Sequence, residues 1–208
     1  MVKTVKTIIL GNLNTGKTSF INNLLYNKFK EYQEPTIGIN MNFKQYNIDG
    51  QKYDVCFMDP SGSERFKFLN NVYIKNINIV FFIFDLSNKK SLDDVSNHVD
   101  TFNEVNKLNS FSFLIGCKSD KKINVDKEDI IALSKEYDIK YYEVNNKNND
   151  DGKVINDVII KTLTKINFNY DKFKKIKKLE KIEEKRDYYC GWLLPCWTKA
   201  TFPSFSFS

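Results

Sequence analysis

The sequence predicts an α/β protein with a mostly parallel sheet and helices on both faces. Short apolar runs alternate along the chain with segments whose apolar residues recur at helical spacing. The runs at residues 79–84 and 111–115 are almost continuously apolar, as expected of central strands covered on both faces. Between the first strand and the first helix, residues 11–18 (GNLNTGKT) have the spacing of a phosphate-binding loop.

Six strands are expected from the short apolar runs. Asp49-Gly50 is a strong signal for a two-residue hairpin, so we expect the strands that flank it to pair antiparallel. The remaining strands are separated by helical segments and are expected to be parallel. The predicted strands are residues 5–10, 39–48, 53–58, 79–84, 111–115 and a weaker one around Tyr141 and Tyr142.

Four helices are expected from the periodic segments. In the first, Phe20, Ile21, Leu24 and Leu25 share one helical face. The polar stretch 31–35 and the asparagine-rich stretch 145–149 are expected to be loops. The predicted helices are residues 17–27, 91–107, 127–137 and 154–166.

The length of 208 residues fits a single domain followed by a tail, with a predicted boundary between residues 1–170 and 171–208. The formal net charge of +6 is too mild to indicate a nucleic-acid-binding protein. The start of the chain has no secretory signal, and no run approaches the roughly 18 apolar residues that span a bilayer. We therefore expect a cytoplasmic monomer with reduced cysteines.

The phosphate-binding loop carries the clearest chemistry. Its glycines let backbone N–H groups turn towards a phosphate, and the following helix adds the positive end of its dipole. Lys17 supplies a full positive charge, and the hydroxyl of Thr18 is suited to ligate Mg²⁺. A glycine-containing turn with a chance lysine is the competing interpretation. The strand before the loop and the amphipathic helix after it disfavour that alternative.

Three further motifs follow in the order and spacing of one family. They are Pro35-Thr36-Ile37-Gly38, Asp59-Pro60-Ser61-Gly62 followed by Glu64-Arg65-Phe66, and Lys118-Ser119-Asp120. Together with the phosphate loop they cover about residues 5–168. The chain resembles the small GTPases of the Ras superfamily, most of all the Rab branch, which regulates vesicle traffic. The resemblance implies the small-GTPase fold, GTP and GDP as ligands, and Mg²⁺ as cofactor.

The resemblance also implies residue roles. Thr36 would close on Mg²⁺ and the γ-phosphate, Asp59 would hold Mg²⁺ through water, and the Gly62 N–H would contact the γ-phosphate. Phe29 would stack on guanine, and Asp120 would accept its N–H groups. The implied metal ligands are Thr18, Thr36 and Asp59, and the implied catalytic residues are Lys17, Thr36, Gly62 and Ser63. The implied nucleotide-binding residues are Asn14, Thr15, Gly16, Lys17, Thr18, Ser19, Phe29, Thr36, Gly62, Cys117, Lys118, Asp120, Asn145, Asn146 and Lys147.

Two departures from the family concern hydrolysis. Ser63 stands where the family has the glutamine that orients the attacking water, and serine is too short for that task. Leu13 stands in the phosphate loop where the family has a small residue, so it would crowd the γ-phosphate. We expect slow GTP hydrolysis. The alternative is a GTP-binding scaffold without useful hydrolysis. A P-loop kinase or nucleic-acid ATPase would need an acceptor site, a lid or a basic groove, and the sequence shows none.

Two departures concern the base and the partners. Cys117 replaces the asparagine that precedes the lysine of the guanine motif, a loss worth on the order of 1–3 kcal/mol. The family's next motif, which reads Asn145-Asn146-Lys147 here, contacts guanine through a backbone N–H, so Asn146 is still expected to serve. Nucleotide binding should survive, with faster exchange. Residues 30–75 are expected to contact exchange factors, activating proteins and effectors. Met41 and Met58 replace aromatic residues of the family's partner-reading surface, whereas Tyr73 matches it.

The tail departs furthest from the family. Residues 171–187 hold eight basic and five acidic side chains. The last four residues contain no cysteine, so prenylation by the usual route is not supported. Palmitoylation of Cys190 or Cys196, beside the basic segment and on the cytosolic face of an internal membrane, is one hypothesis. A tail with no membrane role is the other, and the sequence does not favour either.

Overall fold

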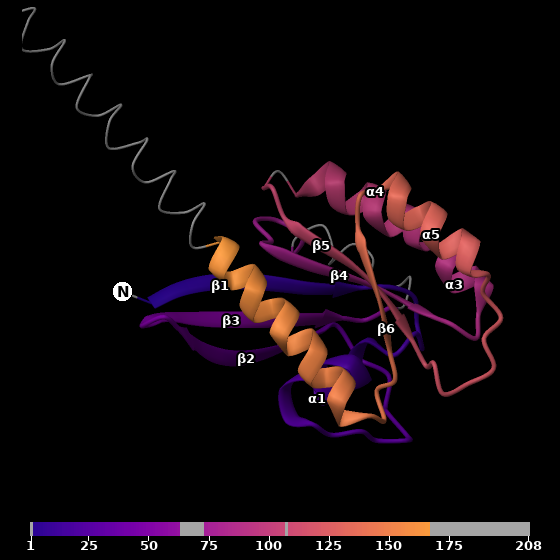
Figure 1. The fold of residues 1–208 in the computed structure, drawn as a ribbon, viewed down its shortest axis with the longest axis horizontal. Coiled ribbons are helices and arrows are strands. Elements are labelled where there is room, and N and C mark those ends of the chain that lie inside the picture. Colours follow the sequence, from indigo (N-terminus) through magenta and orange to yellow (C-terminus); the bar gives the residue numbers. More distant parts are fainter. Residues whose placement is uncertain (1, 63–72, 107, 167–208) are drawn as a thin grey trace, which may run out of the picture. The chain divides into compact units, whose positions relative to one another are not determined.

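The computed structural model describes residues 2–62, 73–106 and 108–166, and within them the chain forms one six-stranded sheet (Figure 1). The strand order is β2-β3-β1-β4-β5-β6. Only β2 and β3 pair antiparallel, and every other neighbouring pair is parallel. This arrangement confirms the predicted fold class. The strands are β1 (Val2–Leu10), β2 (Ile39–Ile48), β3 (Gln51–Pro60), β4 (Ile79–Asp85), β5 (Phe111–Cys117) and β6 (Lys140–Val144).

The antiparallel pair is joined by the predicted two-residue hairpin. Asp49 and Gly50 have φ angles of 50° and 78°, the positive values that the tight primed turns require. Ile48 pairs with Gln51 on the two sides of the turn, and the ladder continues to Ile39 and Pro60. The β3 strand is therefore longer at both ends than the apolar run 53–58 predicts, because backbone pairing with β2 continues past the apolar residues.

The described helices are α1 (Lys17–Tyr26), α3 (Lys89–Asp93), α4 (Val95–Val105), α5 (Lys127–Glu136) and a further helix at residues 149–166. The prediction of one continuous helix over 91–107 is wrong. The chain is interrupted at Asp94, whose φ of −77° and ψ of −9° keep it close to helical geometry. Because the bend is this slight, the apolar periodicity runs through it and does not reveal it.

The last helix begins five residues earlier than predicted. The Asn148 side chain accepts a 3.0 Å hydrogen bond from the backbone N–H of Asp150, which satisfies a donor of the first helical turn. Asn149 is therefore helical, although the asparagine-rich composition of 145–149 is typical of a loop. Asn148 in this stretch caps the helix, and composition alone does not distinguish a capping asparagine from a loop asparagine.

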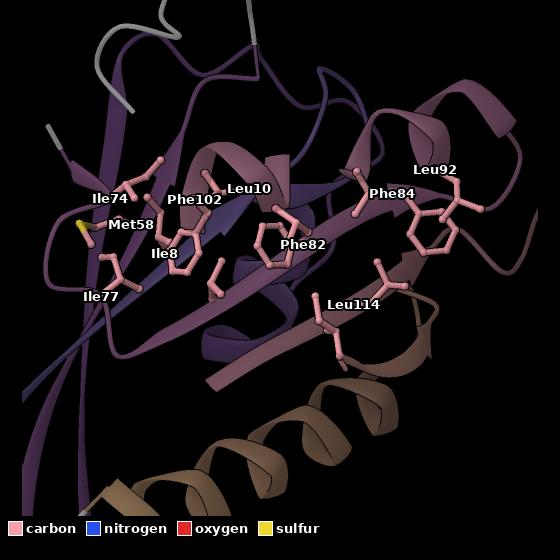
Figure 2. Packing of buried hydrophobic residues seen from close by; sticks show 14 of the residues in the cluster. Ile8, Leu10, Met58, Ile74, Ile77, Phe82, Phe84, Leu92, Phe102 and Leu114 are labelled. Atoms are coloured by element: carbon pink, nitrogen blue, oxygen red, sulfur yellow. The ribbon is translucent and has the colours of Figure 1, made fainter. Parts of the chain in front are cut away.

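Helices cover both faces of the sheet, as neighbouring residues of β4 show. Phe81 meets Phe20 of α1 with ring centroids 5.3 Å apart, whereas Phe82 meets Phe102 of α4 at 5.8 Å. Side chains that follow each other along a strand point to opposite faces, so α1 and α4 lie on opposite sides. Figure 2 shows the cluster on the α4 side, where Phe82 lies among the side chains of β1, β4 and β5.

The C-terminal tail lies outside the described residues. The chain divides into a unit at Met1–Thr164 and a second at Lys165–Ser208, of which only the first two residues are described. The predicted boundary at residue 170 and the proposed acylation of Cys190 or Cys196 thus stay predictions. None of the described helices combines the length and the apolar character needed to cross a bilayer.

Candidate nucleotide site

The phosphate loop connects the buried end of β1 to the first residue of α1. Gly16 precedes the helix with a φ of 104°, in the region that favours glycine. Thr15 is buried, and its hydroxyl donates a 2.9 Å hydrogen bond to the Asn12 carbonyl. The loop is therefore closed by its own side chains. The N-terminus of α1 lines a cleft, and the positive end of a helix dipole stabilises anions in general.

Lys17 is a buried cation without an anionic partner at hydrogen-bond distance among the described residues. Its side chain is 6% exposed, and Nζ donates a 2.8 Å hydrogen bond to the Asn12 carbonyl. Burial lowers the pKa of Lys17 from 10.5 to about 8, although the charge of Asp59 opposes this shift. A bound phosphate would stabilise the charged form, so the burial of Lys17 fits an anion-binding role.

Three side-chain oxygen groups meet beside Lys17. The Thr18 hydroxyl donates a 2.6 Å hydrogen bond to Asp59 Oδ2 and lies 3.1 Å from the Thr36 hydroxyl. The other carboxylate oxygen, Asp59 Oδ1, is buried without a hydrogen-bond partner in the described part of the chain. Burial raises the pKa of Asp59, and the Thr18 hydrogen bond and the Lys17 charge oppose that shift. Hard oxygen donors with one unsatisfied carboxylate oxygen fit Mg²⁺.

Gly62 lies directly against the phosphate loop. A Cβ atom at this position would be 2.5 Å from Lys17 Nζ and 2.6 Å from the backbone nitrogen of Leu13. Any side chain there would collide with the loop, so only glycine allows this approach. The Ser61 N–H donates a 2.8 Å hydrogen bond to the Gly38 carbonyl. The segment after β3 is thereby joined to the segment before β2.

The predicted base-binding side chains also lie together. Lys147 Nζ is 2.9 Å from Asp120 Oδ2 and 5.7 Å from the centre of the Phe29 ring. The hydrogen bond from Lys147 is the main cause that holds the pKa of Asp120 below its ordinary value. Lys118 Nζ donates 2.5 and 2.6 Å hydrogen bonds to the Asn14 carbonyl and to Asp85 Oδ2. Lys118 thus connects the base-binding segment to the phosphate loop.

The segment 145–147 follows β6 and closes the same side of the cleft. The Asn145 N–H donates to Asp151 Oδ2 at 2.6 Å, and the Lys147 N–H donates to Asn145 Oδ1 at 2.9 Å. Within the described ranges no backbone or side-chain acceptor takes the Asn146 N–H. That N–H is the one predicted to contact guanine, and its freedom is compatible with the role.

A single cleft of about 490 Å³ gathers most of the predicted residues. Thr15, Asp59 and Cys117 do not line it; each is buried. Ser63 lies outside the described residues. The predicted residues that line the cleft are Asn14, Gly16, Lys17, Thr18, Ser19, Phe29, Thr36, Gly62, Lys118, Asp120, Asn145, Asn146 and Lys147. Leu13 also lines it, with its side chain 49% exposed.

Sequence reasoning missed the contact between the phosphate loop and α4. Asn12 Nδ2 donates a 2.6 Å hydrogen bond to Asp94 Oδ2, and Asn12 Oδ1 lies 2.9 Å from His98 Nε2. Asp94 and His98 are four residues apart, so they project from the same side of the helix. That spacing is the only sequence signal, and it does not indicate which residue the pair contacts.

The predicted partner-reading residues differ in accessibility. Met41 is 45% exposed on the edge strand β2, whereas Met58 on β3 is only 4% exposed. Tyr73 is partly buried and packs against the cluster of Figure 2. Of these three side chains, Met41 is the most accessible to a partner.

The fold and the cleft together define a P-loop nucleotide-binding protein. Residues 6–167 match the family model described as Ras family, and the chain belongs to that family. It is a small GTPase of the Ras family by descent, distantly related to the Rab proteins.

The curated relatives are distant Rab proteins. The chain is 34% identical over 117 residues to Ras-related protein RabV of Dictyostelium discoideum, covering 56% of this chain and 50% of RabV. It is 26% identical over 144 residues to Ras-related protein Rab-13 of Canis lupus familiaris, covering 68% of this chain and 71% of Rab-13. It is 27% identical over 157 residues to human Ras-related protein Rab-36, covering 73% of this chain and 59% of Rab-36. The chain thus spans about half the length of RabV.

Proposed function

We propose that this chain is a Rab-like switch that binds GTP and GDP with Mg²⁺, hydrolyses GTP slowly and regulates vesicle or membrane traffic. The observation that carries the proposal is the 490 Å³ cleft, which is lined by the phosphate loop, by Thr18 and Thr36 of the oxygen cluster and by the base-binding side chains. Each of the three groups suits a different part of a guanine nucleotide. Their arrangement in one cleft supports a single ligand that spans them.

In this proposal the buried Lys17 binds the β- and γ-phosphates, and the N-terminus of α1 faces the same charge. Thr18, Thr36 and, through water, Asp59 would hold Mg²⁺, which would neutralise phosphate charge. Phe29 stacks on the base, while the ionised Asp120 accepts its N–H groups. The Asn146 N–H, which is free within the described part of the chain, is the donor proposed for the base carbonyl.

The switch would arise from the segments that carry Thr36 and Gly62. Thr36 reaches the site through its 3.1 Å contact with the Thr18 hydroxyl, and Gly62 lies against Lys17. Both segments would be held by contacts to the γ-phosphate and released when it is lost. Partners would read that difference through residues 30–75, part of which lies outside the described residues.

A GTP-binding scaffold without useful hydrolysis is the second candidate function. The half-exposed Leu13 side chain in the cleft favours it, because it occupies space beside the phosphate-binding groups. Ser63 in place of glutamine favours it as well. The first candidate is favoured by the residues suited to phosphate and Mg²⁺, which are all present: Lys17, Thr18, Thr36 and Asp59. Single-turnover hydrolysis decides between the two candidates.

We further propose that the tail brings the protein to the cytosolic face of an internal membrane through acylation of Cys190 or Cys196. The basic segment 171–187 supports this, since it would be attracted to an anionic surface. Flotation of the wild type with liposomes, compared with the Cys190→Ser/Cys196→Ser variant from the same eukaryotic host, tests it. Equal flotation of both would leave a tail without an acylated anchor.

The nucleotide proposal is tested by identifying the nucleotide that copurifies and by competition binding. Guanosine diphosphate should displace a fluorescent guanine nucleotide, and adenosine diphosphate should not. Asp120→Ala should lower guanine affinity at least tenfold, since charged hydrogen bonds contribute about 1.5–3 kcal/mol. Asp157→Ala, an exposed change on the last helix, is the matched control. Equal displacement by the two nucleotides would defeat the proposal.

A further inference from the structure

Two residues at the ends of neighbouring strands lie beneath Gly16 of the phosphate loop. A Cβ at Gly16 would lie 3.3 Å from Asn146 Nδ2 and 3.5 Å from Cys117 Cβ. Cys117 ends β5, and Asn146 follows β6, the next strand of the sheet. Gly16 therefore rests directly on the base-binding side of the site.

Cys117 is poorly suited to hold Gly16 by hydrogen bonding. Its side chain is completely buried, and burial raises the pKa of its thiol to about 12. The neutral thiol is a weak donor and a weak acceptor. The Gly16 carbonyl accepts from Phe20 within α1 at 2.8 Å, and Cys117 offers no strong donor for its second lone pair.

The Asn146 amide occupies the gap beside the thiol. Its Nδ2 lies 3.4 Å from the Gly16 carbonyl oxygen and 3.6 Å from Cys117 Sγ, with suitable hydrogen-bond geometry in both cases. The side chain is 5% exposed. Its Oδ1 is buried without a hydrogen-bond partner in the described ranges, so the amide is anchored through its nitrogen alone.

We infer that Asn146 is a positioning residue whose side-chain amide ties the base-binding loop to the phosphate loop and supplies the donor that Cys117 lacks. This inference rests on the proposed binding of guanine nucleotide. It assigns the side chain of Asn146 a task separate from that of its backbone N–H. The loop that contacts the base and the loop that contacts the phosphates are then held at a fixed spacing, which suits one rigid ligand.

The test is the release rate of a fluorescent GDP from the magnesium-loaded protein. Asn146→Ala removes the tether and should accelerate release about tenfold, the effect of losing one buried hydrogen bond. Asn146→Asp keeps the size of the side chain, removes both N–H donors and should accelerate release at least as much. Asn124→Ala is the matched control, because the Asn124 amide also donates to a backbone carbonyl, that of Ser87 at 3.0 Å, but is not among the side chains nearest to Gly16 in the described part of the chain.

Rescue separates a tether from a general structural role. In the Asn146→Ala background, Cys117→Asn restores an amide beneath Gly16 and should slow release again towards the wild-type rate. A double variant that releases as fast as Asn146→Ala would overturn the inference. So would wild-type-like release, within about twofold, by the folded Asn146→Asp protein. A wild type without saturable guanine-nucleotide binding would instead defeat the proposed function itself.

Discussion

Lys147 Nζ lies 2.9 Å from Asp120 Oδ2, so the carboxylate proposed to read guanine is already paired with a cation. The pair is partly exposed, with side-chain exposures of 50% and 24%. Its contribution to stability is therefore small and screened by salt. Its main effect is on protonation, because the hydrogen bond from Lys147 lowers the pKa of Asp120 and keeps the carboxylate ionised to a lower pH than an ordinary aspartate.

The first prediction concerns binding in acid. The hydrogen bond from Lys147 lowers the pKa of Asp120, so the folded protein loses its base-reading carboxylate only below the ordinary titration range of aspartate. Lys147→Ala raises that pKa, and the acid limb of guanine-nucleotide binding should move to higher pH. Binding curves for wild type and variant from about pH 3, below the ordinary aspartate pKa of about 3.9, up to about pH 7 measure the shift as a difference, which cancels titration of the nucleotide. Superimposable curves would contradict the prediction.

The second prediction concerns magnesium. Thr18 donates its hydrogen bond to Asp59 Oδ2 and lies beside Thr36, so it belongs to the proposed metal site. Removal of Mg²⁺ with EDTA should accelerate GDP release from the wild type by at least about tenfold. In Thr18→Ala the two release rates should converge, since one oxygen ligand is gone. Thr164→Ala, which removes a hydroxyl that donates to the Ile160 carbonyl within the last described helix, should behave as the wild type does.

The third prediction concerns the rate of hydrolysis. Leu13 occupies the cleft beside Lys17, and Ser63 cannot orient water as glutamine does. The double variant Leu13→Gly/Ser63→Gln should hydrolyse GTP at least about tenfold faster than the wild type in single-turnover assays, a barrier change of about 1.4 kcal/mol. A wild type already as fast as the double variant would show that these two side chains do not limit turnover.

The fourth prediction concerns the contact between α4 and the phosphate loop. Asn12→Ala and Asp94→Ala each break a 2.6 Å hydrogen bond to a carboxylate, and each should lower the free energy of unfolding by about 1–2 kcal/mol. Because they break the same bond, the double variant should cost less than the sum of the two. Urea unfolding of the wild type, the two single variants and the double variant measures the coupling free energy between the two side chains. Asp93→Ala provides an exposed control. Strict additivity would rule the contact out as a stabilising one.

The sheet was predictable because its signals are local. The apolar runs of β4 and β5 and the Asp49-Gly50 turn each depend on a few adjacent residues. The bend at Asp94 was not predictable, since its near-helical geometry leaves the apolar period intact. The early start of the last helix was also missed, because the capping role of Asn148 depends on which N–H groups are unpaired.

The candidate site, like the fold, could be predicted from the sequence only in part. The motifs predicted that Thr18 and Asp59 belong to one site although 41 residues separate them. The contacts of Asn12 with Asp94 and of Asn146 with Gly16 span 82 and 130 residues and belong to no motif. Such pairs depend on the packing of α4 and on the end of β6, which the linear pattern does not specify.

The contact of Asn12 with α4 has a practical consequence. The Asp94 carboxylate only accepts hydrogen bonds, so Asn12 turns its nitrogen to Asp94 and its oxygen to His98. The Nε2 atom of His98 must then carry the hydrogen. Since His98 is the sole histidine of the chain, its imidazole signals in an NMR spectrum are free of overlap from other histidines. The molecule thus contains a natural spectroscopic reporter, one hydrogen bond away from the loop that is proposed to bind phosphate.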